Sequence, residues 1–524
     1  MSKRRSILNI AVSIFFKIAL LIGNLLVRRY LIRFIGNEVN GLNSLYLSII
    51  GMLSVVELGI GSAIIYCMYK PIVMGDTEKV FSLYKLFKKL YLIIGGIIAV
   101  AGCALMPFLP YLAKGYADID VNLYLTFGIM LLSIVITYFF SAQTSLMNAY
   151  EDNYVATTIT SSGQLLQYIL QVAVLFLTQS FIWYLICRIV AALVQLLLSD
   201  IIAKKRYPAV FASASKRIDN GTKKEIVKNV KAMFLHRIGG VLVNTIDSII
   251  ISAFIGVAIL GKYSNYVTIM TAMTGVLCLF FTPLTATIGR LFINDGGEFK
   301  KYYNFFCTLN FILGCVFFLG YYAIIDDLVA LFFGAGLEVE KSISFVITVN
   351  YFIQFIRQAT LLFKDASGIF YYDRWKPIFE GLSNLVLSIV FVLVFQKIFN
   401  DDLAVVGVIV ATIVTNLTIC HIVEPHVLHK YAFHSSARRY YIRNYSFILA
   451  FILALCVLNF CMMHYNDRFV ELLINGSIAV GISILPIAGA ILVDRDFRYY
   501  AKALLKGIKR KSSNSAHKGD GGSE

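Results

Sequence analysis

Charged residues are scarce in this chain. They make up 15% of its 524 residues, whereas 59% are hydrophobic, and the mean hydropathy is +0.76. No soluble core of this size requires so much apolar surface, so the composition excludes an ordinary soluble globular protein. Apolar runs of about 20 residues, the length that crosses ~30 Å of hydrocarbon as a helix, recur from end to end. The sequence therefore predicts an all-α polytopic membrane protein.

The chain also lacks the patterns of catalytic, nucleotide and metal sites. Its nine cysteines are scattered singly through apolar runs, with neither disulfide nor metal spacing. The run GVAILGKY is close to the sequence of a phosphate-binding loop. However, Tyr263 occupies the position at which that loop has the serine or threonine whose hydroxyl binds magnesium. No nucleophile is accompanied by a base. Four histidines cluster without standard zinc spacing: His421, His426, His429 and His434. We therefore expect no enzyme, no metal and no cofactor.

About fourteen transmembrane helices are expected. Their approximate spans are residues 7–32, 42–67, 91–112, 122–148, 156–178, 182–203, 232–256, 265–288, 303–325, 342–363, 377–396, 404–424, 444–464 and 471–493. With the N-terminus inside, most of the 47 lysines and arginines fall in inner segments, and basic loops stay cytoplasmic. Both termini are thus expected in the cytoplasm. The net charge of +17 reflects this asymmetry and attraction to an anionic bilayer, and does not indicate a nucleic-acid partner.

One stretch of the sequence occurs twice in similar form. RFIGNEVNGLNSLYLSI, residues 33–49, matches AFIGVAILGKYSNYVTI, residues 253–269, at an offset of 220. The matched residues include Gly36 with Gly256, Gly41 with Gly261, Ser44 with Ser264 and Tyr46 with Tyr266. Similar offsets pair Tyr91 with Tyr303 and Asp152 with Asp373. The nearly constant offset predicts two copies of one six-helix unit. Because six is even, the copies share one topology, and we expect the substrate site between them.

This repeat divides the chain into five parts. An N-lobe, residues 1–203, holds helices 1 to 6, and a C-lobe, residues 232–424, holds helices 7 to 12. Residues 204–231 form a basic cytoplasmic linker between them. Helices 13 and 14, in residues 425–493, lie outside the repeat, and residues 494–524 form a basic cytoplasmic tail whose end has a disordered composition.

Several charges fall inside the predicted helices. The basic ones are Lys17, Arg28, Arg29, Arg188, Arg237 and Arg357, and the deep acids are Glu57 and Asp247. A charge at the bilayer centre costs about 2.5 to 3.5 kcal/mol, so such side chains usually face a polar interior. The interior thus carries an excess of positive charge, which suits an anionic ligand.

The first predicted helix carries a polar stripe. Lys17, Asn24 and Arg28 are seven and four residues apart, a spacing that puts them on one helical face. Arg237 and Asn244 repeat Lys17 and Asn24 in the seventh helix. We expect both stripes to face the space between the lobes. The alternative is that these basic side chains extend to the lipid headgroups.

Glu57 is the acid that most needs a partner. It lies in the middle of the second predicted helix, where an unpaired carboxylate facing lipid would be costly. We expect it to face protein or a cavity and to lie within reach of Arg28 or Arg29. It could then form a structural ion pair, position a sugar hydroxyl or carry a coupling proton.

Three segments carry a resemblance to a known family. LLVRRYLIRFIGNEVNGLNSLY, VELGIGSAIIYCMYKPI and EPHVLHKYAF resemble the polysaccharide-transport branch of the multidrug/oligosaccharidyl-lipid/polysaccharide exporter superfamily, the Wzx-type flippases. The resemblance implies two six-helix lobes in a V, with two additional helices. It also implies export of a polyprenyl-diphosphate-linked oligosaccharide across the bacterial plasma membrane, with a polysaccharide polymerase or glycosyltransferases as expected partners.

The resemblance also implies that basic cavity residues hold the diphosphate. The candidate substrate-binding set is Lys17, Asn24, Arg28, Arg29, Glu57, Arg188, Arg237, Asn244, Asp247 and Arg357. A lipid II-type flippase would use a comparable cationic cavity and stays open as an alternative. A cation-coupled drug exporter should instead show mostly carboxylates. A membrane glycan polymerase or ligase often has a large outer loop, whereas the outer loops here are short.

Overall fold

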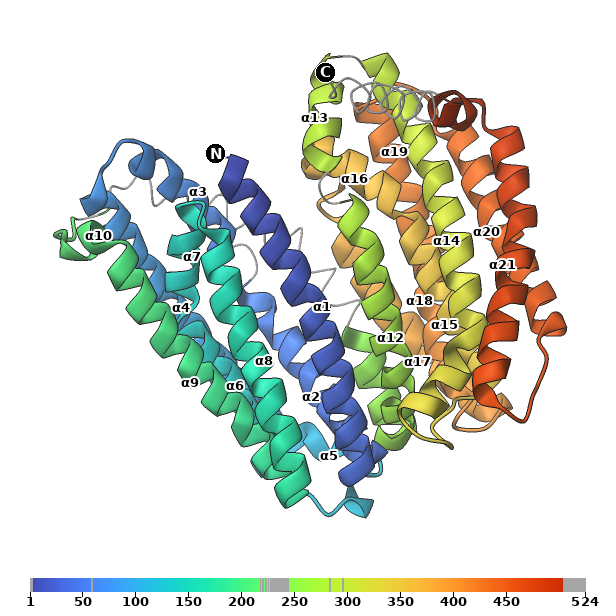
Figure 1. Cartoon of the computed structure of the whole chain (residues 1–524), viewed down its shortest axis with the longest axis horizontal. Coiled ribbons are helices and arrows are strands. Elements are labelled where there is room, and N and C mark those ends of the chain that lie inside the picture. The colour runs from blue at the N-terminus through green and yellow to red at the C-terminus, as the bar shows by residue number, and fades with distance from the viewer. Residues whose placement is uncertain are drawn as a thin grey trace, which may run out of the picture. The chain divides into compact units, whose positions relative to one another are not determined.

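The computed structural model describes residues 3–57, 60–216, 218, 221, 224, 226, 245–281, 284–294 and 296–502. In these residues the chain is almost entirely helical and contains no β-strand (Figure 1). Ten helices are long and apolar enough to cross a membrane: Thr77–Leu112, Leu123–Ala149, Asn153–Thr178, Phe181–Arg206, Gly297–Phe332, Lys341–Ser367, Lys376–Ile398, Ala404–Tyr431, Arg438–Cys461 and Arg468–Val493. The predicted all-α, multi-pass class is confirmed.

These ten helices coincide with ten of the expected spans. Of the other four, residues 7–32 lie within α1 (Lys3–Phe34), and residues 265–288 begin within α12 (Val257–Phe281). Most of residues 232–256 lie outside the described residues, and a short apolar helix, Thr245–Ile255, covers their end. The total of fourteen spans and the side on which each terminus lies remain predictions.

The expected continuous span at residues 42–67 is wrong. The structure breaks it into α2 (Asn37–Leu53), a 3₁₀ turn (Ser54–Glu57) and α3 (Ile60–Val73). At the break, the Ser54 hydroxyl donates to the carbonyl oxygen of Ile50, 2.9 Å away. A serine that bonds back to the preceding turn competes with the backbone and bends the helix.

The chain folds into two compact units. Unit 1 contains residues 1–268, 332–338 and 377–408, and unit 2 contains residues 269–331, 339–376 and 409–524. Both units are discontinuous in sequence, and α12 contributes to both. The predicted lobes and linker follow from the sequence repeat, whereas these units follow from contacts in the structure. The boundaries of the lobes and linker therefore remain a proposal.

In unit 1, α1 packs on α8, α8 on α9, and α9 on α6. Besides those already given, its helices are α4 (Thr77–Leu105), α5 (Leu109–Leu112), α6 (Leu123–Tyr138), α7 (Ser141–Ala149), α8 (Asn153–Thr178), α9 (Phe181–Arg206), α10 (Pro208–Ala212) and most of α17 (Lys376–Ile398). Between α8 and α9 the chain turns within two residues, because Gln179 adopts a left-handed conformation with φ of 48°.

In unit 2, α13 packs on α16, α16 on α19, and α20 on α21. The helices of this unit are α13 (Thr285–Asn294), most of α14 (Gly296–Phe332), α15 (Lys341–Ile356), α16 (Gln358–Ser367), α19 (His421–Tyr431), α20 (Arg438–Cys461) and α21 (Arg468–Val493). A π-helical segment, η7 (Asn416–Cys420), joins α18 (Ala404–Thr415) to α19. Several breaks in these helices meet at the buried cluster described below.

The two copies of the repeated stretch share an unusual backbone conformation. Gly36 has φ 122° and ψ 164°, and it immediately precedes α2. Gly256 has φ 143° and ψ 163°, and it immediately precedes α12. Residues with a side chain rarely adopt this conformation, so glycine is required at both turns. The offset of 220 therefore joins positions with the same backbone geometry, as the repeat predicts.

Candidate functional site

The polar stripe of α1 lies on a helix that is partly exposed along its length. The Lys17 and Asn24 side chains are exposed, whereas Arg28 is half-buried. Gly23 lies against α8, where a β-carbon would come within 2.6 Å of the Tyr168 ring. α1 therefore approaches α8 closely near Arg28.

Arg28 is held entirely by neutral acceptors. Its Nη2 donates to the Ser44 hydroxyl at 3.0 Å, and its Nη1 donates to Asn265 Oδ1 at 3.3 Å and to the carbonyl oxygen of Ser264. Asn40 Nδ2 also donates to Asn265 Oδ1, at 3.2 Å. Ser44 and Ser264 are equivalent positions in the repeat, so the guanidinium joins the two copies of the repeated stretch.

A second arginine lies near the first. Tyr184, which is buried on α9, is within electrostatic range of both Arg28 and Arg188. Arg188 also interacts with Tyr168 of α8, whose hydroxyl accepts from Gln164 Nε2 at 3.0 Å. In the described residues, neither Arg28 nor Arg188 makes an ion pair with a carboxylate. Two desolvated cations without a counter-ion create a site that favours an anion.

Arg29 is stabilised differently. Its guanidinium carbon lies 5.1 Å from the centroid of the Phe332 ring, a cation–π distance. This contact accounts for a basic side chain at this position without a ligand. Arg29 is thus the weakest member of the predicted anion-binding set.

The prediction that Glu57 lies beside Arg28 or Arg29 is wrong. The Tyr91 hydroxyl donates to Glu57 Oε1 at 3.1 Å, and the Tyr138 hydroxyl also lies close to this carboxylate. Both tyrosines are buried. The phenol of Tyr91 donates to the acid, and neutral oxygens accept from Arg28, so neither group needs the other. The expectation that Glu57 faces protein with a polar partner is confirmed.

Three predicted site residues lie at or beyond the edge of the described region. Asp247 is buried, with 8% of its surface exposed, on the short helix Thr245–Ile255. Arg237 and Asn244 lie outside the described residues. The repeated stripe on the seventh helix therefore stays a prediction.

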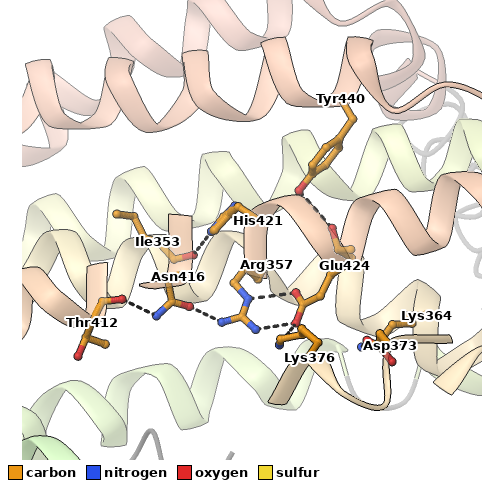
Figure 2. Close-up of polar contacts among 11 residues, drawn as sticks. Ile353, Arg357, Lys364, Asp373, Lys376, Thr412, Asn416, His421, Glu424 and Tyr440 are labelled. Atoms are coloured by element: carbon orange, nitrogen blue, oxygen red, sulfur yellow. Dashed lines mark hydrogen bonds and ion pairs between the residues drawn. The ribbon is translucent and has the colours of Figure 1, made fainter. Parts of the chain in front are cut away.

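Arg357 belongs to a buried ionic cluster in unit 2 (Figure 2). It holds Glu424 with two parallel hydrogen bonds, Nη2 to Oε1 at 2.7 Å and Nε to Oε2 at 3.1 Å. Lys376 Nζ lies 2.6 Å from the same Oε1. The side chains of Arg357, Glu424 and Lys376 are 12%, 1% and 7% exposed. One carboxylate therefore holds two buried cations.

The cluster forms where two helices are irregular. Arg357 lies between α15 and α16, and it donates to Asn416, the first residue of the π-helical segment η7. His421 Nε2 donates to the carbonyl oxygen of Ile353 at 3.0 Å, and Asn444 Nδ2 lies 2.8 Å from His421 Nδ1. A carbonyl can only accept and an amide nitrogen can only donate, so His421 is the neutral tautomer with its proton on Nε2. Side chains thus satisfy the backbone groups that the breaks release.

The aspartates paired by the repeat are both buried and both held by cations. Asp373 accepts from Lys364, with side chains 1% and 3% exposed. Asp152 lies 2.7 Å from Arg206 Nε and accepts from the Tyr207 hydroxyl at 2.8 Å. Burial and this hydrogen bond to an anion raise the pKa of Tyr207.

The sequence-based count of deep acids was too low. Glu424 and Asp373 are buried and paired, although their positions in the sequence placed them at the end of a span and in an inner segment. Hydropathy locates the ends of an apolar run but does not show which flanking charges are covered by other helices. The one available signal was a glutamate directly before Pro425 inside a helix. Arg357 therefore has a carboxylate partner, whereas Arg28 and Arg188 have none among the described residues.

The sequence matches one family model. The family is described as Polysaccharide biosynthesis protein, and the match covers residues 6–288. No curated protein matches the chain.

The fold is similar to that of solved transporters. One is the lipid II flippase MurJ in an inward closed conformation, with a TM-score of 0.64 and 14% identity over 94% of this chain and 99% of that one. Another is an inward-facing multidrug resistance MATE family transporter of the MOP superfamily, with a TM-score of 0.60 and 14% identity over 81% and 100%. A third is a MOP superfamily transporter from Pyrococcus furiosus, with a TM-score of 0.52 and 15% identity over 86% and 99%. The chain has the fold of these proteins.

Proposed function

The chain belongs to the polysaccharide biosynthesis protein family, and we propose that it is a flippase for polyprenyl-diphosphate-linked oligosaccharide repeat units. It moves them from the inner to the outer leaflet of a bacterial plasma membrane, for cell-surface polysaccharide biosynthesis. The observation that carries the proposal is the pair of arginines, Arg28 and Arg188, for which no carboxylate among the described residues is a partner.

The chemistry of the substrate fits this site. A diphosphate carries negative charge on oxygens that a guanidinium binds through two parallel N–H groups. The exposed Lys17 and Asn24 extend the polar face along α1, so the head group has donors over several turns of the helix. The neutral acceptors around Arg28 orient its guanidinium without cancelling its charge.

The mechanism we propose is alternating access. The head group enters from the cytoplasmic side, the two predicted lobes rock about it, and the lipid tail stays in the bilayer. With the cytoplasm negative, each net negative charge that moves outward gains about 2.3 kcal/mol per 100 mV if it crosses the full field. The membrane voltage thus favours export.

The main alternative is a lipid II-type substrate. The fold similarity to a lipid II flippase and the cationic site are compatible with it, because the two substrates share the diphosphate and differ in the sugars. A drug exporter that binds cations does not suit Arg28 and Arg188. The alternative from another class is an enzyme, a glycan polymerase or ligase. Such an enzyme needs a nucleophile with a neighbouring base, and the sequence shows no such pair.

The test is complementation of a strain that lacks its own flippase. Lys17→Ala or Arg237→Ala should each impair display of the surface glycan, and the double reversal Lys17→Glu, Arg237→Glu should abolish it, since repulsion is added to lost attraction. A matched control is Lys88→Glu with Lys89→Glu, two exposed lysines on α4. Normal display from the Lys17 and Arg237 reversal, at normal protein level in the membrane, would refute the assignment of these two residues.

A further inference from the structure

A pocket of about 550 Å³ opens where α19 ends and α20 begins. All its lining residues come from one stretch of unit 2, residues 426–441. The basic side chains among them are His426, His429, Lys430, His434 and Arg438, and no acidic residue lines the pocket. The pocket is separate from the arginine site of unit 1 and is not needed for the function proposed above.

Two side chains of this pocket, Lys430 and Arg438, are positively charged at neutral pH and are not paired with a carboxylate among the described residues. Lys430 and Arg438 are exposed, and neither makes an ion pair in the described residues. Lys430 instead lies 5.3 Å from the centroid of the Tyr431 ring, which leaves its ammonium hydrogens available. Because basic side chains line the pocket and no carboxylate does, its local potential is positive.

Hydrogen bonds within the stretch fix His429 and the backbone of Ser435, and they leave one neutral donor, the Ser435 hydroxyl. His429 Nδ1 is 2.9 Å from the carbonyl oxygen of Pro425, so Nδ1 carries the proton and donates there. The backbone of Ser435 is fixed by a 2.9 Å hydrogen bond from its N–H to the carbonyl oxygen of His429. The Ser435 hydroxyl oxygen is buried and has no hydrogen-bond partner, although most buried hydroxyls have one. An oxyanion that reached this hydroxyl from the pocket would supply the acceptor that it lacks among the described residues.

The start of α20 adds to the positive potential. The helix has 24 residues and its N-cap is Ala437, and the N–H of Arg438 donates to the Ser436 hydroxyl at 3.3 Å. The first N–H groups of a helix and its dipole favour an anion. With Lys430, Arg438 and Ser435, these groups form a set of donors with no competing carboxylate.

We propose that this pocket binds a phosphate group. The proposed ligand chemistry is a phosphate monoester, diester or diphosphate, held by Lys430, Arg438 and the Ser435 hydroxyl. The group can come from the headgroup of an anionic lipid or from a soluble phosphate compound. Ile422 and Ile442, beside the lining residues, are 45% and 62% exposed, so apolar surface of the kind that faces lipid adjoins the pocket.

The experiment uses the full-length protein in nanodiscs, with two arms. In the first arm, native mass spectrometry measures how much phosphatidylglycerol is retained over phosphatidylcholine from mixed nanodiscs. In the second arm, thermal unfolding in phosphatidylcholine nanodiscs is followed while inorganic pyrophosphate is added. The pocket variant is Lys430→Gln with Arg438→Gln. The control is Lys89→Gln with Arg439→Gln, which removes the same charge from exposed residues outside the pocket.

The proposal expects the pocket variant to weaken phosphate binding about tenfold or more in at least one arm, because charge-assisted hydrogen bonds are lost. The control should bind as the wild type does. An effect in the lipid arm alone identifies a lipid headgroup, and an effect in the pyrophosphate arm identifies a soluble ligand. Ser435→Ala, which keeps every charge, should weaken the same arm by a smaller factor. Equal behaviour of pocket and control variants in both arms, at equal unliganded stability, overturns the proposal.

Discussion

Gly41 of α2 and Gly261 of α12 each lie directly against the backbone of the other helix. A β-carbon on Gly41 would stand 1.8 Å from the carbonyl oxygen of Val257. A β-carbon on Gly261 would stand 2.4 Å from the carbonyl oxygen of Asn37. An offset of 220 exchanges these two contacts, because it relates Gly41 to Gly261 and Asn37 to Val257. The first turns of α2 and α12 therefore pack as a symmetric pair.

This packing predicts that neither glycine tolerates alanine. Gly41→Ala or Gly261→Ala forces two helices apart, and we expect a loss of about 1–3 kcal/mol or more in the free energy of unfolding. The control is Gly96→Ala, since no atom lies within 4 Å of a β-carbon there and alanine favours the helix. The measurement is thermal unfolding of the purified protein. Equal midpoints for Gly41→Ala and Gly96→Ala would contradict the close approach.

Arg28 is expected to need its guanidinium as well as its charge. Two of its nitrogens make three hydrogen bonds to α2 and α12, which one ammonium cannot reproduce. Arg28→Lys should therefore give reduced glycan display in a strain lacking its flippase, and Arg28→Gln should give none. Arg29→Lys should be tolerated, because an ammonium also interacts with the Phe332 ring. Full display from Arg28→Gln would remove this arginine from the proposed site.

The sequence was most informative where a pattern extends over many residues. Hydropathy located ten helices, and the repeat offset related Gly36 to Gly256, whose backbone conformations agree. It was least informative about side-chain partners. The pairing of Glu57 with Tyr91, and of Arg357 with Glu424, depends on which helices pack together and where they break. Spacing along a helix predicts which side chains share a face of that helix, but it does not predict contacts with other helices.

The buried cluster predicts unequal effects of its members. Glu424→Gln removes the carboxylate that Arg357 and Lys376 share, and removing one partner of a buried pair costs about 3–5 kcal/mol. Lys376→Met should cost less, because the two parallel bonds between Arg357 and Glu424 remain. Thermal unfolding of the purified variants measures both.

A double variant separates charge repulsion from lost packing. Glu424→Gln combined with Lys376→Met removes the carboxylate together with one of the two cations that it holds. We expect it to be more stable than Glu424→Gln alone, a non-additive result that only interacting residues produce. Additive losses would show that the ionic contacts contribute little and that volume alone determines the effect.

Glu57 is predicted to act as a hydrogen-bond acceptor and not as a carrier of protons. Its Oε1 accepts from Tyr91 at 3.1 Å, and a glutamine oxygen can accept the same bond without a charge. Glu57→Gln should therefore keep most of the glycan display, whereas Glu57→Leu should lose it, because the buried phenol of Tyr91 is left without its acceptor. Tyr91→Phe should lower the free energy of unfolding by about 1 kcal/mol, the usual net value of one such bond. The measurements are complementation at matched protein level and thermal unfolding. If Glu57→Gln abolishes display while the protein remains as stable as the wild type, the carboxylate must titrate during transport, and the acceptor role is wrong.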